Sequence, residues 1–336
     1  MAEGRPDYPS APIRIGILGA ARIAPAALVK PARLNNEVVV TAIAARDPAH
    51  AAAFAAKHGI GSVRENYEAL VADPGIDAVY NPLPNGLHAE WTTRALEAGK
   101  HVLCEKPFAS NADEAAKVAS VAESTGLVVM EAFHYRYHPL ARRMEEIISS
   151  GELGTLGRVE AWVCFPLPRF SDIRYRYDLG GGAQMDAGCY SVHLARLLGG
   201  EEPTVVAAEA KLRAPQVDRA MTAELRYPSG HTGRVTCSMW SSSLLRIGAR
   251  VIGTDGELRV LNPLAPQIYH RLSVKTTGRS RVEHLPRRPT YAYQLDAFCG
   301  AVLHGEPTLT PPADSIANMR VIDAIYRAAG LKPRGT

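Results

Sequence analysis

The stretch IRIGILGAARIA, residues 13–24, decides the fold of this chain. Its first six residues form an apolar run typical of a buried parallel strand, and an alanine-rich segment that favours a helix follows to about Arg33. Gly19, Ala21 and Ala24 occupy the three small positions of a dinucleotide-binding fingerprint at the turn between strand and helix. This arrangement lets a pyrophosphate approach the N–H groups at the helix start. Because alanine replaces the second glycine, an ordinary strand–helix turn stays open as an alternative.

Apolar or β-branched runs alternate with helical segments through the first half of the chain. This alternation predicts a doubly wound parallel sheet, and hence an N-terminal Rossmann domain of residues 1–134 within an α/β fold. Right-handed crossovers place the C-terminal ends of the strands along one edge, where such sheets bind their ligands. Further strands are expected at residues 37–44, 78–81, 101–104 and 127–131, and helices at 48–57, 88–98 and 112–123.

The pattern changes after about Pro139. Several strand candidates follow one another, joined by turn signals such as Asp255-Gly256, and this succession suggests an antiparallel sheet. We therefore predict a C-terminal α+β domain, residues 135–336, with a mainly antiparallel sheet. Strands are expected at 158–165, 204–212, 220–227, 233–241, 249–253 and 256–261, and helices at 140–149, 180–198, 291–303 and 314–329.

The composition excludes several classes of protein. The 336 residues suggest about two domains, and the net charge of +4 indicates neither a nucleic-acid nor a membrane partner. No apolar run is long enough for a transmembrane helix, and the first residues lack the layout of a signal peptide, so a cytoplasmic location is expected. The five scattered cysteines contain no C-x-x-C pair, which argues against a disulfide framework or a zinc site. Residues 271–289 carry six Lys or Arg side chains, and we expect a solvated hairpin there.

The end of the second strand bears on the choice of cofactor. A carboxylate here accepts hydrogen bonds from the adenosine ribose of NAD, whereas an arginine pairs with the 2′-phosphate of NADP. Arg46 precedes Asp47, which favours NADP over NAD, although Asp47 can instead be the N-cap of the next helix. In the first turn we expect Arg22 and Ile23 to contact the cofactor, while Arg22 can equally be solvated.

A lysine follows the strand at 101–104. In the segment Cys104-Glu105-Lys106-Pro107, Lys106 points toward the place where such sheets hold a ligand, and Glu105 and Lys106 are expected at the cofactor. The alternative is a surface lysine in a loop. Pro107 restricts Lys106 to an extended backbone and can itself be cis.

A second group of expected cofactor contacts follows the strand at 78–81. Pro84, Asn85 and His88 lie at the cofactor edge of the predicted sheet, where they can line the nicotinamide pocket. His88 can equally begin a helix and have a purely structural role.

Residues 180–193, GGGAQMDAGCYSVH, join a glycine cluster to polar groups on a helix. Asp186 and Tyr190 are four residues apart and His193 lies three further on, so the three side chains share one helix face. A carboxylate, a phenol and an imidazole on one stripe are expected to bind or activate a substrate. The alternative is a buried tyrosine whose hydroxyl is satisfied by Asp186 or His193.

Two histidines four residues apart, His134 and His138, have a spacing that also occurs in helical metal sites. No third ligand is evident nearby, and Pro139 follows at once. We therefore expect a polar cleft lining or a structural pair, and no metal.

Taken together, these motifs resemble the Gfo/Idh/MocA family of NAD(P)-dependent oxidoreductases across essentially the whole chain. The resemblance implies a Rossmann domain and an α/β domain with a large open sheet, with the active site between them. Lys106 matches the family's E-K-P lysine and Asp186 its aspartate, while Tyr190 stands where inositol dehydrogenases carry histidine. Tyrosine here is similar to the branch with glucose–fructose oxidoreductase, dimeric dihydrodiol dehydrogenase and NADP-linked xylose dehydrogenases. The matching segments are GILGAARIA (16–24), PLPNGLHAEW (82–91), HVLCEKPFA (101–109), MEAFHYRYHP (130–139) and GGGAQMDAGCYSV (180–192).

The residues and the resemblance predict hydride transfer between a nicotinamide and a secondary alcohol or carbonyl of a sugar, cyclic diol or polyol. Tyr190 is the expected general acid or base, with Lys106⁺ lowering the pKa of its phenol or stabilising the reacting oxygen, and Asp186 orienting substrate or Lys106. A nucleotide-linked ketosugar reductase and a noncatalytic NAD(P)-binding regulator stay open as alternatives. A homo-oligomer, a dimer or tetramer, is expected because an apolar face of the open sheet needs cover.

Overall fold

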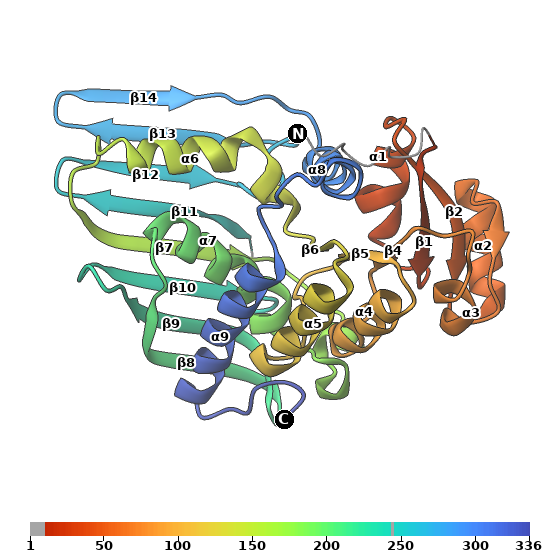
Figure 1. The fold of residues 1–336 in the computed structure, drawn as a ribbon. Helices are drawn as coiled ribbons and strands as arrows, with labels where there is room; N and C mark the ends of the chain where they lie inside the picture. Colours follow the sequence, from red (N-terminus) through yellow and green to blue (C-terminus); the bar gives the residue numbers. More distant parts are fainter. Residues whose placement is uncertain (1–10, 243–244) are drawn as a thin grey trace.

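The computed structural model describes residues 11–242 and 245–336 and shows two sheets side by side (Figure 1). The first ten residues, on which the expectation about a signal peptide rests, lie outside the described part. Within that part, no helix is long and apolar enough to cross a membrane. The predicted combination of a parallel sheet and a second, mainly antiparallel sheet is confirmed.

The N-terminal sheet has six parallel strands in the order β3-β2-β1-β4-β5-β6. β1 is almost entirely buried, as expected for a strand inside a doubly wound sheet. The two-residue strand β3 and the short helix α3 lie outside the sequence prediction, because neither has an apolar run long enough to be recognised. The strands are β1 (Ile13–Leu18), β2 (Val38–Ala44), β3 (Ser62–Val63), β4 (Ala78–Asn81), β5 (His101–Cys104) and β6 (Val129–Glu131), and the helices between them include α2 (Pro48–His58), α3 (Tyr67–Val71), α4 (His88–Glu97) and α5 (Ala112–Thr125).

The helix after β1 is irregular. It consists of a π-helical turn, η1 (Pro25–Val29), followed by α1 (Lys30–Ala32). Pro31 has no N–H to donate to a carbonyl of the preceding turn, which disfavours a regular α-helix here. The turn that leads into it nevertheless has the expected form, with Gly19 at a φ of +88° and Ala24 fully buried.

The C-terminal sheet has eight strands in the order β14-β13-β12-β11-β7-β10-β9-β8. β7 and β10 pair in parallel and the other neighbours are antiparallel. Helices α7 and α9 pack against one face of it (Figure 1), and the predicted basic hairpin forms β13 and β14. The strands are β7 (Leu156–Cys164), β8 (Thr204–Ala214), β9 (Val217–Arg226), β10 (Thr232–Ser238), β11 (Arg246–Gly253), β12 (Gly256–Leu261), β13 (Arg271–Thr276) and β14 (Arg279–Glu283); the helices are α6 (Pro139–Ser149), α7 (Cys189–Gly199), α8 (Thr290–His304) and α9 (Pro312–Ala328).

Two helices of the second half return to the N-terminal sheet. α8 buries Leu295 and Phe298 in the same core as Ile15, and α9 packs against α5. For α8 the structure therefore departs from the predicted division at residues 134 and 135, because this helix packs with the Rossmann core. The local pattern cannot show this, since the apolar face of a helix does not specify which sheet it covers.

Candidate active site

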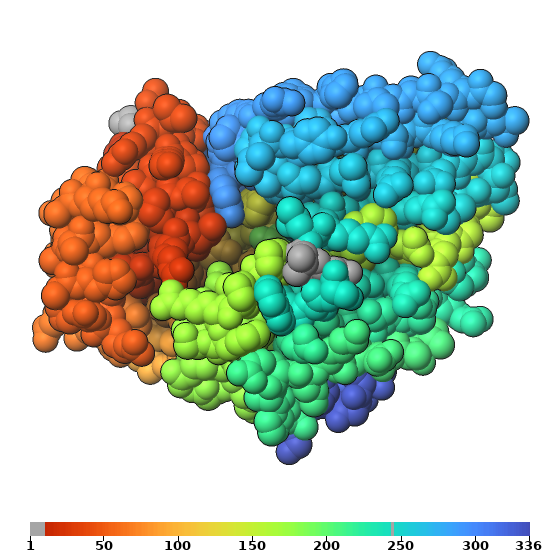
Figure 2. Space-filling model, turned by 180° about the vertical axis from the view of Figure 1, so that it is seen from behind, coloured from red at the N-terminus to blue at the C-terminus, as the bar shows by residue number. Residues whose placement is uncertain are grey.

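A cavity of about 680 Å³ lies between the two sheets, and Figure 2 shows the molecule hollowed between its N-terminal lobe and the remainder. The turns that follow β1, β4 and β5 line it from the N-terminal side. The segment after β7 and parts of η6 (Gln184–Gly188), α7 and α8 line it from the other. The C-terminal strand ends of the Rossmann sheet thus meet at one ligand-sized cavity, as predicted.

The turn after β1 presents unused backbone donors to this cavity. Gly19 is held in place by its N–H bond to the carbonyl of Ala44 (2.6 Å), and residues 20–23, including Arg22 and Ile23, line the cavity. Among the residues that the structure describes, the N–H groups of residues 20–23 donate to no protein acceptor. Free N–H groups at the start of a helix suit the pyrophosphate of a dinucleotide. The residues present therefore fit the expected cofactor.

The two charged residues that follow β2, Arg46 and Asp47, have different surroundings in the structure. Asp47 caps α2, because its Oδ1 accepts hydrogen bonds from the N–H groups of Ala49 (2.9 Å) and His50 (3.4 Å). Arg46 is exposed, and the structure shows no side-chain bond or ion pair for it within the described residues. The carboxylate is thus engaged in capping, while the guanidinium stays available to a 2′-phosphate.

The residues after β4 have mainly structural partners. Pro84 and Asn85 line the cavity, and the side-chain amide of Asn85 donates to the carbonyl of Gly180 across the two lobes (3.1 Å). Both ring nitrogens of His88 lie within hydrogen-bond distance of carbonyl oxygens, those of Pro107 (2.6 Å) and Leu83 (2.7 Å), and the single N–H of the neutral ring donates to one of them. Burial lowers the pKa of His88 to about 4, against the effect of these two carbonyls. His88 forms part of the wall but has no free nitrogen for a cofactor, which favours its structural role.

Glu105 is buried beside the candidate catalytic lysine. Its Oε1 accepts a hydrogen bond from the phenol of Tyr80 (2.7 Å), and burial raises the pKa of its carboxyl. It lines the cavity, as expected for a residue at the end of β5. The peptide bond between Lys106 and Pro107 is cis.

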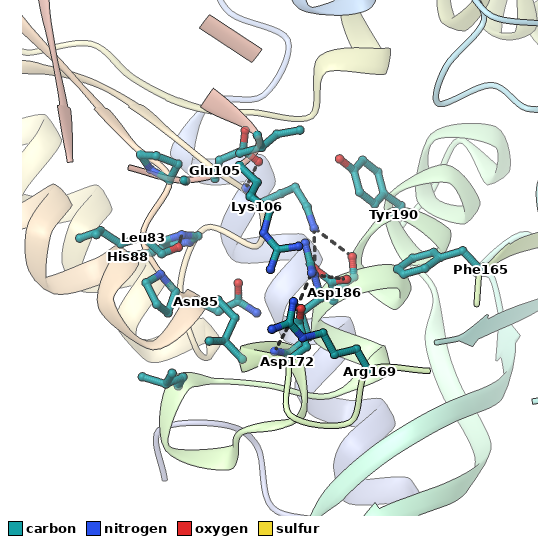
Figure 3. A pocket seen from close by; sticks show the side chains of 18 of the residues that line it. Leu83, Asn85, His88, Glu105, Lys106, Phe165, Arg169, Asp172, Asp186 and Tyr190 are labelled. Atoms are coloured by element: carbon teal, nitrogen blue, oxygen red, sulfur yellow. Dashed lines mark hydrogen bonds and ion pairs between the residues drawn. The ribbon is translucent and has the colours of Figure 1, made fainter. Parts of the chain in front are cut away.

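Lys106 and Asp186 come from different lobes and meet in the cavity (Figure 3). The ammonium of Lys106 donates to the backbone carbonyl of Asp186 (3.0 Å) and to its Oδ1 (3.2 Å), while Arg174 Nε contacts Oδ2 (3.0 Å). Burial acts to raise the pKa of Asp186, but the two cations outweigh it and lower that pKa below its ordinary value. Burial likewise acts to lower the pKa of Lys106, yet Asp186, Cys189 and Glu105 together outweigh it and the pKa is raised. The pair is therefore an ammonium and a carboxylate at neutral pH.

Tyr190 lies next to this pair. The ammonium nitrogen of Lys106 is 5.1 Å from the centre of the Tyr190 ring, and the phenol oxygen is 3.2 Å from His134 Nε2. Burial raises the pKa of the phenol well above 10. This corrects the expectation that Lys106 lowers that pKa: the expectation assumed a solvated cleft, whereas the ring is nearly buried and the ammonium lies over its face.

His193 does not reach the cavity, in contrast to the prediction that it binds substrate. Its Nδ1 is bonded to the hydroxyl of Tyr135 (2.5 Å), its Nε2 to Oδ2 of Asp314 (3.0 Å), and its ring stacks on Phe133. It follows Tyr190 by three residues, and on α7 this offset turns it toward the start of α9 and away from the cavity. Both nitrogens are engaged inside the protein, so His193 has a structural role here.

The two histidines that precede α6 point to different partners. His134 contacts Thr290 and Tyr190, while His138 caps α6 by accepting from the N–H of Leu140 (3.0 Å). In the described part of the chain, no three His, Cys, Asp or Glu side chains are grouped as metal ligands.

Several cavity residues lie outside the sequence prediction. Phe165, Arg169, Asp172 and Arg174 all belong to the irregular segment after β7. Arg174 bridges Asp186 and Asp172, whereas the side chain of Arg169 has no bonded partner among the described residues. The sequence of this segment contains clustered charges and aromatic rings. Because these residues follow no helical or strand period, the sequence does not indicate which of their side chains face the cavity.

Two family models match this chain: "Oxidoreductase family, NAD-binding Rossmann fold" over residues 13–133 and "GFO/IDH/MocA C-terminal domain" over residues 141–259. Together they cover more than half of the chain. The protein therefore belongs to the Gfo/Idh/MocA oxidoreductase family, as its motifs predicted. It is an NAD(P)-dependent oxidoreductase.

Individual relatives are similar over nearly their full lengths. D-xylose 1-dehydrogenase (NADP(+)) 2 from Haloferax volcanii is 42% identical, covering 94% of this chain and 96% of that protein. A 3-ketoreductase from Actinomadura kijaniata, solved with NADP and TDP-benzene, has a TM-score of 0.88 at 32% identity, covering 94% of this chain and 98% of that one. An aldose-aldose oxidoreductase from Caulobacter crescentus, complexed with glycerol, has a TM-score of 0.87 at 26% identity over 95% and 98% of the two chains.

Proposed function

We propose that this protein is an NADP-dependent dehydrogenase of a free aldose. The observation that carries the proposal is the meeting of Lys106, Asp186 and Tyr190, from two lobes, in one cavity beside the phosphate-binding turn. The 42% identity to a D-xylose 1-dehydrogenase over nearly the whole chain supports an aldose as the substrate. The exposed guanidinium of Arg46 supports NADP over NAD.

Lys106 holds the reacting oxygen. An ammonium has three donors, and two of them are used by Asp186, so one remains for a substrate oxygen. Asp186 fixes the direction of that donor and keeps the amine protonated. A fixed donor aimed at a developing oxyanion typically contributes about 10²–10³-fold to turnover.

Tyr190 exchanges the proton. When bound, the nicotinamide accepts or returns the hydride. The phenol lies in the same cavity as Lys106 and carries its proton at neutral pH, so it can give that proton to a carbonyl oxygen. In the oxidative direction the phenol first gives its own proton to solvent, and the phenolate oxygen then takes the proton of the substrate hydroxyl. Such transfers typically contribute about 10²–10⁴-fold.

One observation favours a second candidate function, the reduction of a nucleotide-linked ketosugar. Arg169 lines the cavity without a bonded partner in the described residues, and a free guanidinium can pair with a diphosphate. The likeness to a 3-ketoreductase solved with TDP-benzene is consistent with this alternative.

A substrate panel separates the two candidates. The absorbance of NADPH is followed with NADP⁺ and free aldoses, including xylose and glucose, and with NADPH and a TDP-linked ketosugar. We expect oxidation of a free aldose that is insensitive to Arg169→Ala. Turnover of the nucleotide-linked sugar alone, lost in Arg169→Ala, establishes the second candidate instead. NAD⁺ in place of NADP⁺ tests the cofactor in the same assay.

The oligomeric state and the location are proposals of the same kind. Exposed apolar side chains on the outer strands β8 and β14, including Val206, Leu212 and Val282, support a homo-oligomer, a dimer or tetramer. Sedimentation velocity tests this directly. The cytoplasmic location stays a prediction from the sequence.

A further inference from the structure

His134 is buried behind Tyr190 and connects it to α8. Its side chain is part of a chain of three groups: the Tyr190 phenol, 3.2 Å from Nε2, the imidazole itself, and the Thr290 hydroxyl, 2.8 Å from Nδ1. The ring also packs on Tyr291, with the ring centres 4.2 Å apart. Tyr190 and Tyr291 line the cavity, whereas His134 and Thr290 lie behind them.

The burial of Thr290 decides which nitrogen of His134 carries the proton. Thr290 is fully buried, and within the described residues its hydroxyl contacts His134 Nδ1 alone. If Nδ1 donated to this oxygen, the hydroxyl hydrogen would be buried without an acceptor, which is costly. The arrangement that satisfies both groups has the threonine hydroxyl donating to Nδ1. The single proton of a neutral imidazole then lies on Nε2, facing Tyr190.

The imidazole is neutral in this environment. Burial lowers the pKa of His134 to about 3, and Lys106 acts in the same direction. A neutral ring with its proton on Nε2 donates to the Tyr190 oxygen. The phenol hydrogen is then free, because Tyr190 has no other bonded partner among the described residues. It can turn toward the cavity, where the reacting oxygen binds.

We propose that His134, fixed by Thr290, is a positioning residue that donates a hydrogen bond to the Tyr190 oxygen and stabilises its phenolate form. This inference rests on the proposed role of Tyr190 as the proton-transferring group. In reduction of a carbonyl, the Tyr190 O–H bond breaks and a bond between that proton and the substrate oxygen forms, while a hydride passes from the nicotinamide to carbon. In oxidation the same steps run in reverse. In both directions the phenolate is held by Nε2–H of His134.

The other groups around Tyr190 do not replace this bond. Lys106 lies over the ring face and not at the phenol oxygen. The remaining titratable neighbours do not favour the phenolate, because Tyr291, Glu105, Cys189 and Asp186 all act to raise the pKa of the Tyr190 phenol. A hydrogen bond donated to the phenolate lowers the pKa of the phenol. Loss of the His134 bond must therefore make the phenolate harder to form.

The test is the pH dependence of kcat/KM for the oxidation. His134→Leu is expected to move the alkaline kinetic pKa assigned to Tyr190 upward and to lower kcat about ten- to a hundredfold at neutral pH. His134→Gln retains an amide N–H donor and should recover part of the loss. Thr290→Val removes the hydroxyl that fixes the tautomer and should shift the same kinetic pKa upward by less. The matched variant Thr290→Ser keeps the hydroxyl and should keep the wild-type kinetic pKa.

Comparison with Tyr190→Phe separates a positioning role from a packing role. Because Tyr190→Phe has no phenol, adding His134→Leu to it should cause no further loss of turnover, and the double variant should still bind NADP. An equal further loss there, or an unshifted pH profile in both His134→Leu and Thr290→Val, overturns the inference while leaving Tyr190 as the proton donor. If Tyr190→Phe itself keeps wild-type turnover, the proposed role of Tyr190 and this inference both fail, whereas the proposed function fails only if the substrate panel shows no oxidation of an aldose. If His134→Leu does not fold, the Thr290→Val and Thr290→Ser pair decides alone.

Discussion

Replacing Asp186 with asparagine removes the charge that keeps Lys106 protonated. The two charged atoms are 3.2 Å apart, and both side chains are nearly buried. At an effective dielectric constant of ~20 their attraction is at most about 5 kcal/mol. Even a third of this, about 1.7 kcal/mol, changes the acidity of the ammonium more than tenfold. Without the carboxylate, burial and the neighbouring Arg174 both act to lower the pKa of Lys106.

The predicted consequence is a new alkaline limb in the pH profile of kcat for Asp186→Asn. Lys106 then loses its proton as the pH rises through a range in which the wild-type ammonium persists, and the donor to the reacting oxygen is lost with it. Steady-state kinetics from pH 6 to 10 measure this. The control is Asp172→Asn, which removes a carboxylate paired with Arg174 but not with Lys106 and should introduce no such limb. If Asp186→Asn keeps the wild-type profile and kcat, Asp186 does not keep Lys106 protonated.

Three further predictions address the cofactor and the stability of the fold. Arg46→Ala should reduce the preference for NADP⁺ over NAD⁺ in kcat/KM, and an unchanged ratio excludes Arg46 from the 2′-phosphate site. Arg334→Met should lower the free energy of unfolding by about 3–5 kcal/mol in urea titrations. The reason is that Asp218, a fully buried carboxylate whose Oδ1 lies 2.9 Å from Arg334 Nη2, loses its counter-charge. A change below ~1 kcal/mol contradicts this. Burial opposes ionisation of Asp314, but its bonds from His193 and Arg196 lower its pKa to about 2. Its ionised form therefore stabilises the fold above the unfolded pKa of ~3.9, and this stability is lost as the pH falls toward 2. Asp314→Asn should make the free energy of unfolding less dependent on pH in that window. An unaltered slope of the free energy of unfolding against pH refutes this.

The parts of the site that follow regular elements could be predicted from the sequence. The turn at Gly19 and the position of Lys106 follow from the rule that parallel strands end at one edge. Asp186 and Tyr190 could be predicted together because their spacing of four residues places them on one helix face. The helical face also suggested His193, but a face does not specify partners. Its actual partners, Tyr135 and Asp314, are 58 and 121 residues away in the chain.

The irregular segment and the electrostatics could not be predicted in this way. Arg174 reaches Asp186 from a segment that has no period, so its direction depends on tertiary packing. The expected effect of Lys106 on Tyr190 assumed water around both groups, and the buried ring reverses the sign of the pKa shift. The sequence presents His134 only as one of a pair with His138, because its contact with Thr290, on a distant helix, depends on tertiary packing.

We propose that Lys106 and Tyr190 act on a sugar in the cavity beside bound NADP. The most direct measurement is kcat for Lys106→Ala and Tyr190→Phe, together with NADP affinity from the quenching of protein fluorescence. We expect kcat to fall by about 10²–10⁴-fold in each variant while NADP still binds. Near-normal turnover in both variants would contradict it.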